Sequence, residues 1–374
     1  VTVTLHDLIP LCNPQQYLEP NPRYNAYYTR KLEALRKAAL FLANSEATRQ
    51  EGIQHLAVEE TCVVNVSSGI EPHFSPDVVC AANQANLQTK WGLGASFVLY
   101  TGGDDDRKNL PRLVSAYAAM PKLLRQHCPL VLAGKMQPHN IGDLKLLGSK
   151  NGLSSEDLIF TGYVSDQELI DLYRSCTLFV FPSWHEGFGL PALEAMACGA
   201  PVIGANTSSL PEVIGRDDAL FDPFEVESIS AKMTQALEDA EFRASLREHG
   251  LQRAKVFSWK TSGNLAIAAW EQIHAKRQSA PAVPAGRKPR LAFVSPLPPE
   301  RTGIADYSAE LLPALAHYYD IDVVVAQDRV DDRRVNESAT VRDGAWLKAN
   351  AQNIDRVVYQ FGNSPFHHHM MPLL

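Results

Sequence analysis

The feature that most constrains the fold is a regular alternation of short apolar runs and helical patterns between about residues 95 and 222. The apolar runs read SFVLYTG, LVLAG, LIFTGYV, LFVFPS, PVIGA and ALFD. Helical periodicity lies between them, for example over Leu110–Gln126 and Asp166–Ser175. Buried strands that alternate with amphipathic helices are typical of a parallel, doubly wound α/β sheet. We predict such a sheet here, followed by two or three helices over residues 225–278.

Two segments that each show part of the same alternation of strands and helices flank this region. The first 75 residues predict a strand, a helix over Tyr24–Leu42 and a strand at CVVNVSSG. The segment SAPAVPAGRKP, residues 279–289, is rich in Pro and Ala and is predicted to be a linker. After it we predict a strand at RLAFVSP, a helix over Ala305–Tyr318, and strands at IDVVVA and RVVYQFG. The order is therefore half a domain, a whole domain, a linker and another half domain.

Length and composition narrow the function classes. The 374 residues suffice for two or three domains. A net charge of −7 argues against general nucleic-acid binding, and no apolar run approaches the roughly 18–20 residues of a membrane span. The six cysteines are scattered without a CxxC pair, which suits a reducing compartment. Because VTVTLHDLIPL reads as a strand already in progress, we expect the chain to be a piece of a longer protein.

The stretch FPSWHEGFGLPALEAMACGAPVIG carries the candidate chemistry. Pro191 suits a first helical turn and Gly199 a helix end, so we predict a short helix over residues 191–198. Free backbone N–H groups and the helix dipole at its start favour an anion. Glu186 and Glu194 flank that turn. An isolated Glu194 would be explained by the dipole alone, but the whole string favours a ligand with phosphates and hydroxyls, such as a nucleotide sugar.

Three segments together resemble family 4 glycosyltransferases, which are retaining enzymes with nucleotide-sugar donors. They are EGFGLPALEAMACGAPVIGANTSSLPEVIG, LYTGGDDDRKNLPRLVSAY and FTGYVSDQELIDLYRSC. The resemblance covers residues 85–275 densely. It implies an α/β protein of the GT-B type, with two Rossmann-like doubly wound parallel-sheet domains that face across a cleft. The N-domain would be incomplete or built from two chain segments.

The resemblance also implies roles for individual residues. Glu186 would contact the transferred sugar and Glu194 the ribose, while Arg107 and Lys108 would neutralise the diphosphate leaving group. The sugar and phosphates would be lined by Gly187, Phe188, Gly189 and Leu190. One departure is that Gly102-Gly103 stands where many relatives carry an arginine after the glycine of the first strand.

Two sequence patterns could suggest a metal site, and neither is favoured. The triplet DDD at residues 104–106 invites a Mg²⁺ site, but Arg107 and Lys108 follow it directly and could replace the metal. The histidines at 367–369 lack spacing to a fourth ligand. We therefore expect no metal and no cofactor other than the nucleotide-sugar donor.

Two N-terminal features have both a functional and a structural interpretation. By the resemblance, His6 faces the donor sugar and positions a hydroxyl or transfers a proton; alternatively, it is a strand-end histidine beside Asp7. The helix at residues 23–42 has a basic stripe that could rest on an anionic membrane near a lipid-linked acceptor. We favour a surface helix whose apolar face lies in the core. The stripe consists of Arg23, Arg30 and Lys37. The other side of the helix carries Tyr24, Tyr28, Leu35 and Leu42.

The C-terminal segment repeats part of the pattern. SPLPPERTGIADYSAELLPAL, residues 295–315, resembles the opening loop of a GT-B N-domain, in which Gly303 lets the backbone approach phosphate or acceptor. VVYQFGNSPFHH, residues 357–368, resembles a later strand of that domain. In the family, the next strand ends in HD, and the first strand of this chain ends in HD at residues 6–7. We thus expect the second half of an N-domain (1–85), a C-terminal donor-binding domain (86–278), a linker (279–289) and the first half of a second N-domain (290–374). One hypothesis is that 290–374 and 1–75 pack together; otherwise each would expose an apolar sheet edge.

The expected function is transfer of a hexose, with mannose from GDP-mannose favoured, to a growing polysaccharide or lipid-linked glycan. We expect a cytoplasmic protein, with peripheral contact to the inner face of the cytoplasmic membrane as a further option, and no nucleic-acid partner. Two alternatives are a GT-B sugar-nucleotide epimerase and a non-catalytic module that binds nucleotide sugar or glycan within a tandem protein.

Overall fold

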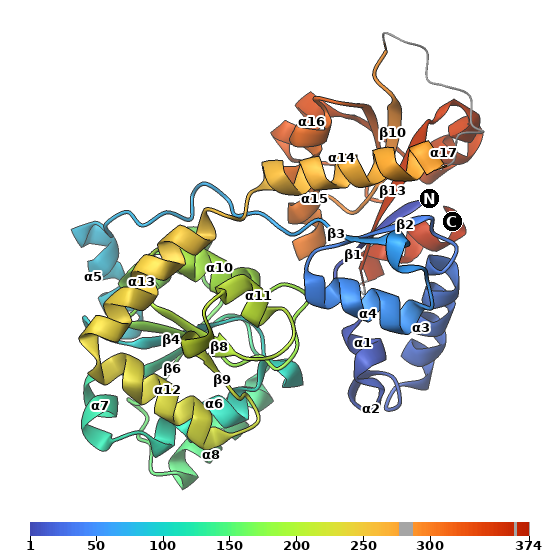
Figure 1. The fold of residues 1–374 in the computed structure, drawn as a ribbon. Helices are drawn as coiled ribbons and strands as arrows, with labels where there is room; N and C mark the ends of the chain where they lie inside the picture. Colours follow the sequence, from blue (N-terminus) through green and yellow to red (C-terminus); the bar gives the residue numbers. More distant parts are fainter. Residues whose placement is uncertain (277–286, 363–364, 374) are drawn as a thin grey trace. The chain divides into compact units, whose positions relative to one another are not determined.

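The computed structural model describes residues 1–276, 287–362 and 365–373 (Figure 1). The chain forms two compact units. The continuous unit comprises Ile70–Phe257, and the split unit comprises Val1–Gly69 together with Ser258–Leu374. Most of the predicted linker lies outside the described residues.

The continuous unit is built around a six-stranded parallel sheet with the order β6-β5-β4-β7-β8-β9. The chain order reverses between β4 and β7, so the carboxyl ends of these two strands form the switch point of a doubly wound sheet. The strands are β4 (Val98–Thr101), β5 (Leu130–Ala133), β6 (Leu158–Gly162), β7 (Leu178–Phe181), β8 (Val202–Ala205) and β9 (Leu220–Phe221).

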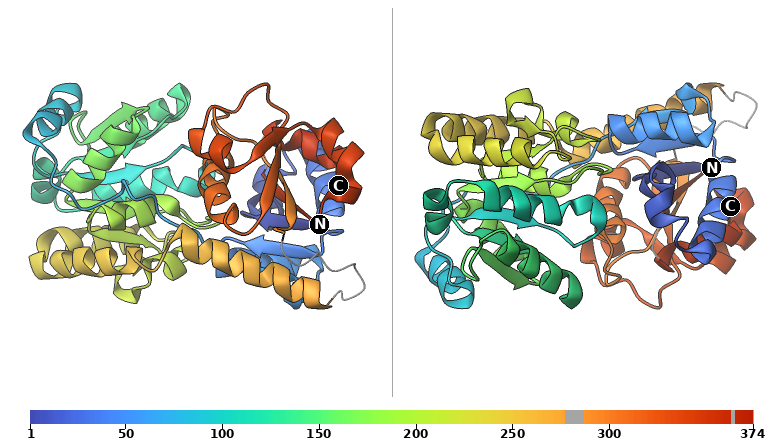
Figure 2. Two further views of the ribbon diagram at one scale, coloured as in Figure 1. Left: turned by 90° about the horizontal axis from the view of Figure 1, so that it is seen from above. Right: turned by 90° about the horizontal axis from the view of Figure 1, so that it is seen from below.

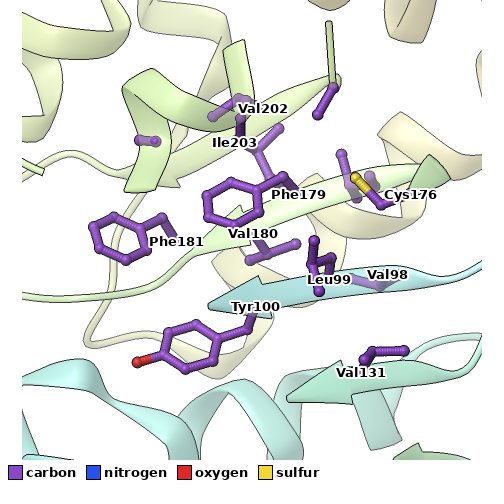
Figure 3. Packing of buried hydrophobic residues seen from close by; sticks show 14 of the residues in the cluster. Val98, Leu99, Tyr100, Val131, Cys176, Phe179, Val180, Phe181, Val202 and Ile203 are labelled. Carbon is purple, nitrogen blue, oxygen red and sulfur yellow. The ribbon is translucent and has the colours of Figure 1, made fainter. Parts of the chain in front are cut away.

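Helices cover both faces of this sheet. Helix α6 packs against α8 and α12, and α10 packs against α9, α11 and α13; α5 contacts α9, and α12 also contacts α13. Figure 3 shows the apolar strand residues that pack between them, including Phe179 and Phe181 with ring centroids 5.9 Å apart. The helices are α5 (Ala81–Trp91), α6 (Leu110–Ala119), α7 (Lys122–His127), α8 (Pro138–Lys150), α9 (Asp166–Ser175), α10 (Leu190–Ala197), α11 (Leu210–Ile214), α12 (Val226–Glu238) and α13 (Ala240–Ala254).

The split unit contains a seven-stranded parallel sheet with the order β12-β11-β10-β13-β1-β2-β3. If the strands are counted from β10 to β13 and then from β1 to β3, this is again the doubly wound order. The strands are β1 (Thr2–Leu5), β2 (Leu40–Ala43), β3 (Val63–Asn65), β10 (Arg290–Val294), β11 (Asp320–Val324), β12 (Thr340–Arg342) and β13 (Arg356–Phe361).

The seam between the two segments runs through the centre of that sheet. β1 pairs in parallel with β13 from Thr2↔Val358 to Leu5↔Phe361. Lys31 adds a tertiary link, because its Nζ donates to the Gly362 carbonyl at 2.6 Å and lies 5.0 Å from the Phe361 ring centroid. In both views of Figure 2 the blue and red segments of this unit lie side by side. The hypothesis that the two segments pack together is confirmed.

The helices of the split unit are α1 (Ile9–Cys12), α2 (Pro14–Tyr17), α3 (Pro22–Leu35), α4 (Glu46–Leu56), α14 (Trp259–Lys276), α15 (Gly303–Leu315), α16 (Arg333–Ser338) and α17 (Gly344–Asn350). Short 3₁₀ turns complete the two units: η1 (Glu60–Cys62), η2 (Asp106–Lys108), η3 (Asp217–Ala219), η4 (Ala351–Asn353) and η5 (Pro365–Leu373). Among the described residues, no helix combines the length and apolar character needed to cross a bilayer.

Three sequence-based boundaries need correction. The helix predicted over Tyr24–Leu42 ends at Leu35, and Leu40–Ala43 form the buried strand β2 beside β1. The helix predicted over Leu110–Gln126 is two helices, because Met120 adopts an extended conformation before Pro121. Helix α14 packs on α15 and β2 and therefore belongs to the split unit. The helix Asp166–Ser175 is confirmed.

Helix α3 matches the structural interpretation of its pattern. Tyr28 and Leu35 are buried, whereas Arg23 and Arg30 are exposed. The apolar face thus lies in the core, and the two arginines of the predicted stripe lie on the surface.

Candidate functional site

The turn between β7 and α10 forms the centre of the candidate site. Gly189 precedes the first residue of α10 and has φ +104°, a left-handed conformation that favours glycine. A Cβ there would lie 2.6 Å from Leu210 Cδ2. Pro191 falls in the first turn of the helix. Backbone conformation and close packing both require glycine here, and α10 starts within one residue of its predicted position.

Two serines before α11 fix this turn. Ser208 Oγ accepts a hydrogen bond from Glu186 N at 3.1 Å. Ser209 Oγ lies 3.0 Å from the Glu186 carbonyl oxygen and 2.7 Å from that of Phe188. The loop is therefore pre-formed by contacts within the continuous unit.

Phe188 has a structural role. Its ring is buried and meets Phe257 edge-on, with centroids 5.5 Å apart. The side chain therefore packs into the core, and only the main chain of this residue is left to line a ligand.

Glu186 forms an ion cluster with two cations from the loop after β4. Its Oε2 lies 2.7 Å from Arg107 Nη1, and its Oε1 lies 2.6 Å from Lys108 Nζ. Burial alone would raise the pKa of the Glu186 carboxyl, but the charges of Lys108 and Arg107 outweigh it and lower that pKa. Burial also lowers the pKa of Lys108, and Glu186 partly offsets the effect. The structure thus brings together three predicted site residues from two chain regions.

The loop after β4 is held against the loop after β7 by Asn109. This residue adopts φ +62° and is buried. Its Nδ2 donates to the Pro182 carbonyl at 3.1 Å and to the Pro223 carbonyl at 2.6 Å. Because β4 and β7 are neighbours at the switch point, these bonds fix the cations at the crevice where doubly wound sheets bind ligands.

Two of the three aspartates at 104–106 support the loop. Asp104 Oδ2 accepts from Gln137 N at 2.5 Å and from Asn140 Nδ2 at 2.8 Å. Asp105 caps the 3₁₀ turn that carries Arg107 and Lys108. These contacts give both carboxylates a structural role.

Glu194 lies one turn into α10 and has a partner that the sequence did not reveal. Tyr173 of α9 donates its hydroxyl to Glu194 Oε2 at 2.9 Å, and Thr101 Oγ1 lies 2.9 Å from the same hydroxyl. Burial raises the pKa of the Glu194 carboxyl to about 7; the Tyr173 bond lowers it and Asp166 raises it. Tyr173 stands in the helical stretch IDLYRSC, where nothing in the pattern separates it from an ordinary core tyrosine.

The other two predicted site residues belong to the split unit. His6 directly follows β1, and its ring meets Tyr307 of α15 edge-on at 5.1 Å. Burial lowers the pKa of His6 to about 4, with Gln360 acting against the shift and Lys31 adding to it. The imidazole is therefore neutral at pH 7. Gly303 is the first residue of α15, which Thr302 caps by accepting a hydrogen bond from Ala305 N.

Of the three C-terminal histidines, two have described side chains. His367 is buried against Gly362, and His369 Nδ1 lies 3.0 Å from the Phe366 carbonyl oxygen.

This is a Rossmann-like, two-domain protein of the GT-B type, as defined by its two doubly wound sheets and by the site at the turn between β7 and α10. Residues 85–253 match the family model "Glycosyl transferases group 1". The chain is 33% identical over 274 residues to O-antigen chain mannosyltransferase B from Escherichia coli, covering 72% of this chain and 70% of that protein. The chain belongs to the glycosyl transferases group 1 family, and the resemblance seen in the sequence is confirmed.

Other relatives agree in fold or sequence. Serotype-specific mannosyltransferase WbdA from Escherichia coli is 41% identical over 268 residues, which are 72% of this chain and 33% of that protein. The chain thus spans about a third of the length of that relative. Sucrose-phosphate synthase from Thermosynechococcus elongatus has a TM-score of 0.61 at 23% identity, covering 74% of this chain and 68% of that one. The Anabaena protein HepE, solved with UDP and glucose, has a TM-score of 0.57 at 20% identity, with coverages of 75% and 71%. The predicted GT-B fold is confirmed.

Proposed function

We propose that this chain is part of a retaining glycosyltransferase that moves mannose from GDP-mannose to a growing polysaccharide or lipid-linked glycan. The observation that carries the proposal is the Glu186–Arg107–Lys108 ion cluster at the start of α10, with Glu194 one turn further on. The names of the two Escherichia coli relatives, both mannosyltransferases, support the choice of sugar.

The site is suited to stabilising a diphosphate as it leaves. Arg107 and Lys108 carry the positive charge, and the backbone of Gly187–Leu190 lies at the N-terminus of α10, where N–H groups and the helix dipole favour anions. When a donor enters, these cations would share their charge between Glu186 and the phosphates. Glu186 would then accept hydrogen bonds from the hydroxyls of the transferred sugar, and Glu194 from those of the ribose.

The proposed reaction is front-face substitution. The acceptor oxygen bonds to the anomeric carbon on the face from which the diphosphate departs, and the acceptor proton leaves with the diphosphate. Glu186 stabilises the positive charge that develops on the sugar without forming a covalent bond. His6 is proposed to position a hydroxyl, because a group with a pKa of about 4 is a weak base at neutral pH.

We further propose that residues 290–374 correspond to the first half of a second N-domain in a tandem protein. The strand order of the split unit supports this, because β10–β13 supply the strands that would precede β1 in a complete domain. The coverage of WbdA, a relative about three times as long as the matched region, is consistent with it. We propose a cytoplasmic location. Peripheral contact with anionic lipid through Arg23 and Arg30 of α3, near a lipid-linked acceptor, is part of this proposal.

The first test is calorimetric titration of the chain with GDP, UDP and ADP, each with and without EDTA. Binding of GDP that EDTA does not alter is the expected result. Preference for UDP or ADP would overturn the choice of donor, and loss of binding in EDTA would overturn the metal-independent site. If none of the three binds, the proposed donor site is wrong for this chain.

A second test separates the enzyme from its rivals. Glu186→Gln should reduce sugar transfer by the parent protein at least a hundredfold. A sugar-nucleotide epimerase would consume donor without acceptor. A binding module would show no turnover in the unsubstituted protein either.

A further inference from the structure

The hydrogen bond between Tyr173 and Glu194 joins two elements of the continuous unit. Tyr173 lies on α9, is fully buried, and its ring meets Phe179 of β7 edge-on at 5.5 Å. Its hydroxyl has one proton, which goes to Glu194 Oε2. When Glu194 is ionised, Thr101, at the carboxyl end of β4, therefore donates its own proton to the Tyr173 oxygen at 2.9 Å. The chain Thr101–Tyr173–Glu194 fixes the carboxylate from the switch point of the sheet.

Tyr173 holds one of the two carboxylate oxygens of Glu194. Among the described residues, Tyr173 is the only side chain that donates a hydrogen bond to Glu194. Glu194 itself is only partly enclosed, so a ligand can reach it. Because Tyr173 fixes one of its oxygens, the carboxylate would meet a ligand hydroxyl in a fixed orientation.

We propose that Tyr173 is a positioning residue for the nucleotide site: it holds Glu194 Oε2 so that the carboxylate meets a ribose hydroxyl in one orientation. The inference rests on the proposed function, because it takes Glu194 to be the ribose contact.

The surroundings of Glu194 suggest how this contact depends on pH. Burial raises its pKa to about 7, so in the empty site the carboxyl is protonated in about half of the molecules at that pH. A hydroxyl that donates to the carboxylate favours the ionised form, so binding expels the proton. The titratable neighbours are Tyr173 and Asp166 of α9 and Cys198 at the end of α10. Helix α10 also contacts α11, α13, β7 and β8. The buried residues of α10 itself are uncharged; they are Ala192, Leu193, Ala195, Met196 and Ala197.

The hydrogen-bond chain can reverse its direction. When Glu194 is protonated it can donate to Tyr173, which can then donate to Thr101. Tyr173 can thus keep its contact in both protonation states, and the carboxylate need not move when the proton leaves.

The test is calorimetry of GDP binding to the whole 374-residue chain at several pH values, in buffers of different ionisation enthalpy. In the unsubstituted protein, GDP should bind more weakly below about pH 7 and release a fraction of a proton at pH 7. Glu194→Gln should abolish that release. Tyr173→Phe removes the bond that lowers the Glu194 pKa, so the affinity should fall about tenfold at pH 7.5 and the midpoint of its pH dependence should rise by about one unit.

A matched control is Tyr117→Phe. Tyr117 is also a fully buried tyrosine of this unit, but its hydroxyl donates to the Cys128 carbonyl at 3.1 Å. This variant should retain both the affinity and the pH dependence. An unchanged midpoint and proton release in Tyr173→Phe would overturn the inference while leaving the donor site intact. If the unsubstituted protein binds neither GDP nor UDP or ADP, the proposed function fails and the inference fails with it.

Discussion

The two units have sheets with the same strand order but different chain connectivity. The six strands of the continuous unit follow one another between Val98 and Phe221. The seven strands of the split unit come from opposite ends of the sequence and meet at the β1–β13 pair. A doubly wound sheet therefore depends on which strands neighbour one another and on buried apolar faces, and does not require an unbroken chain through its centre.

The units also differ at the carboxyl ends of their strands. In the continuous unit this edge carries an ionised cluster of Glu186, Arg107 and Lys108. In the split unit the corresponding edge holds neutral His6 and the buried amide of Gln360. The continuous unit thus has a buried ion cluster at this edge, whereas the split unit has a neutral imidazole with Lys31 and Asp7 nearby.

Deleting residues 277–374 should have the largest effect. The deletion removes β10–β13, so β1 loses one of its two partner strands and the apolar residues of α14 lose α15. Residues 1–69 should lose amide protection almost completely, while residues 70–257 should keep theirs. Hydrogen exchange read by mass spectrometry would show this. Retained protection in β1–β3 would mean that the two segments are not one cooperative unit.

Replacing Lys108 with Met tests the charged edge. The change keeps most of the side-chain stem but leaves Glu186 with Arg107 as its cation partner. Under the proposed mechanism, transfer by the parent protein should fall by about 10²–10³-fold, because the leaving diphosphate would lose one of its two cations. Lys122→Met, at an exposed position of α7, is the control. Equal turnover in both variants would remove Lys108 from the proposed mechanism.

Replacing Lys31 with Met tests the seam of the split unit. Burial lowers the pKa of Lys31 to about 7, whereas in the unfolded chain it lies near 10.5. Between these values the unfolded state binds more protons, so the free energy of unfolding should rise with pH by at most about 1.4 kcal/mol per unit. Chemical denaturation of the split unit at pH 7, 8 and 9 measures this.

The Lys31→Met variant should lose that pH dependence, and at pH 9 it should be about 1–3 kcal/mol less stable because the Gly362 carbonyl loses its donor. The exposed Lys37→Met is the matched control. If the free energy of unfolding of the unsubstituted protein did not change with pH, Lys31 would be shown to stay charged in the folded state.

The smallest expected effect comes from two N-cap serines, one in each unit. Ser45 caps α4 by accepting from Thr48 N at 3.0 Å, and Ser165 forms a capping box with Glu168 at α9. Each change to Ala should cost about 1 kcal/mol. The loss should appear only in the unfolding of the unit that contains the serine. Equal losses in both units from one substitution would show that the units unfold together.

The sequence predicted the elements whose signals are local. Helix α9 has a capping box at its start, and α10 has Gly189 and Pro191, so both were placed within a residue. β2 was missed because AALFLA continues the helical pattern of α3, and only pairing with β1 makes it a strand. α14 was assigned to the wrong unit because its Trp270 contact with Tyr319 joins residues on either side of the linker.

The candidate site likewise contains residues that the sequence predicted and one residue that it did not. The motif identified Glu186, Arg107 and Lys108, and the structure brings them together. Phe188 was expected to line the ligand, yet its ring packs on Phe257. Tyr173 was missed because its role depends on the orientation of one hydroxyl between two helices, which apolar periodicity does not encode.

The β1–β13 pairing also has a consequence for the time course of folding. Closing a longer loop adds little to the equilibrium cost, about 0.6 kcal/mol for each doubling of its length. The search for a partner strand nevertheless becomes slower as contacts become less local. The continuous unit has its strands close together in sequence, whereas Thr2 must find Val358 across nearly the whole chain. After dilution from denaturant, the continuous unit should therefore gain amide protection first, and the split sheet should gain it later.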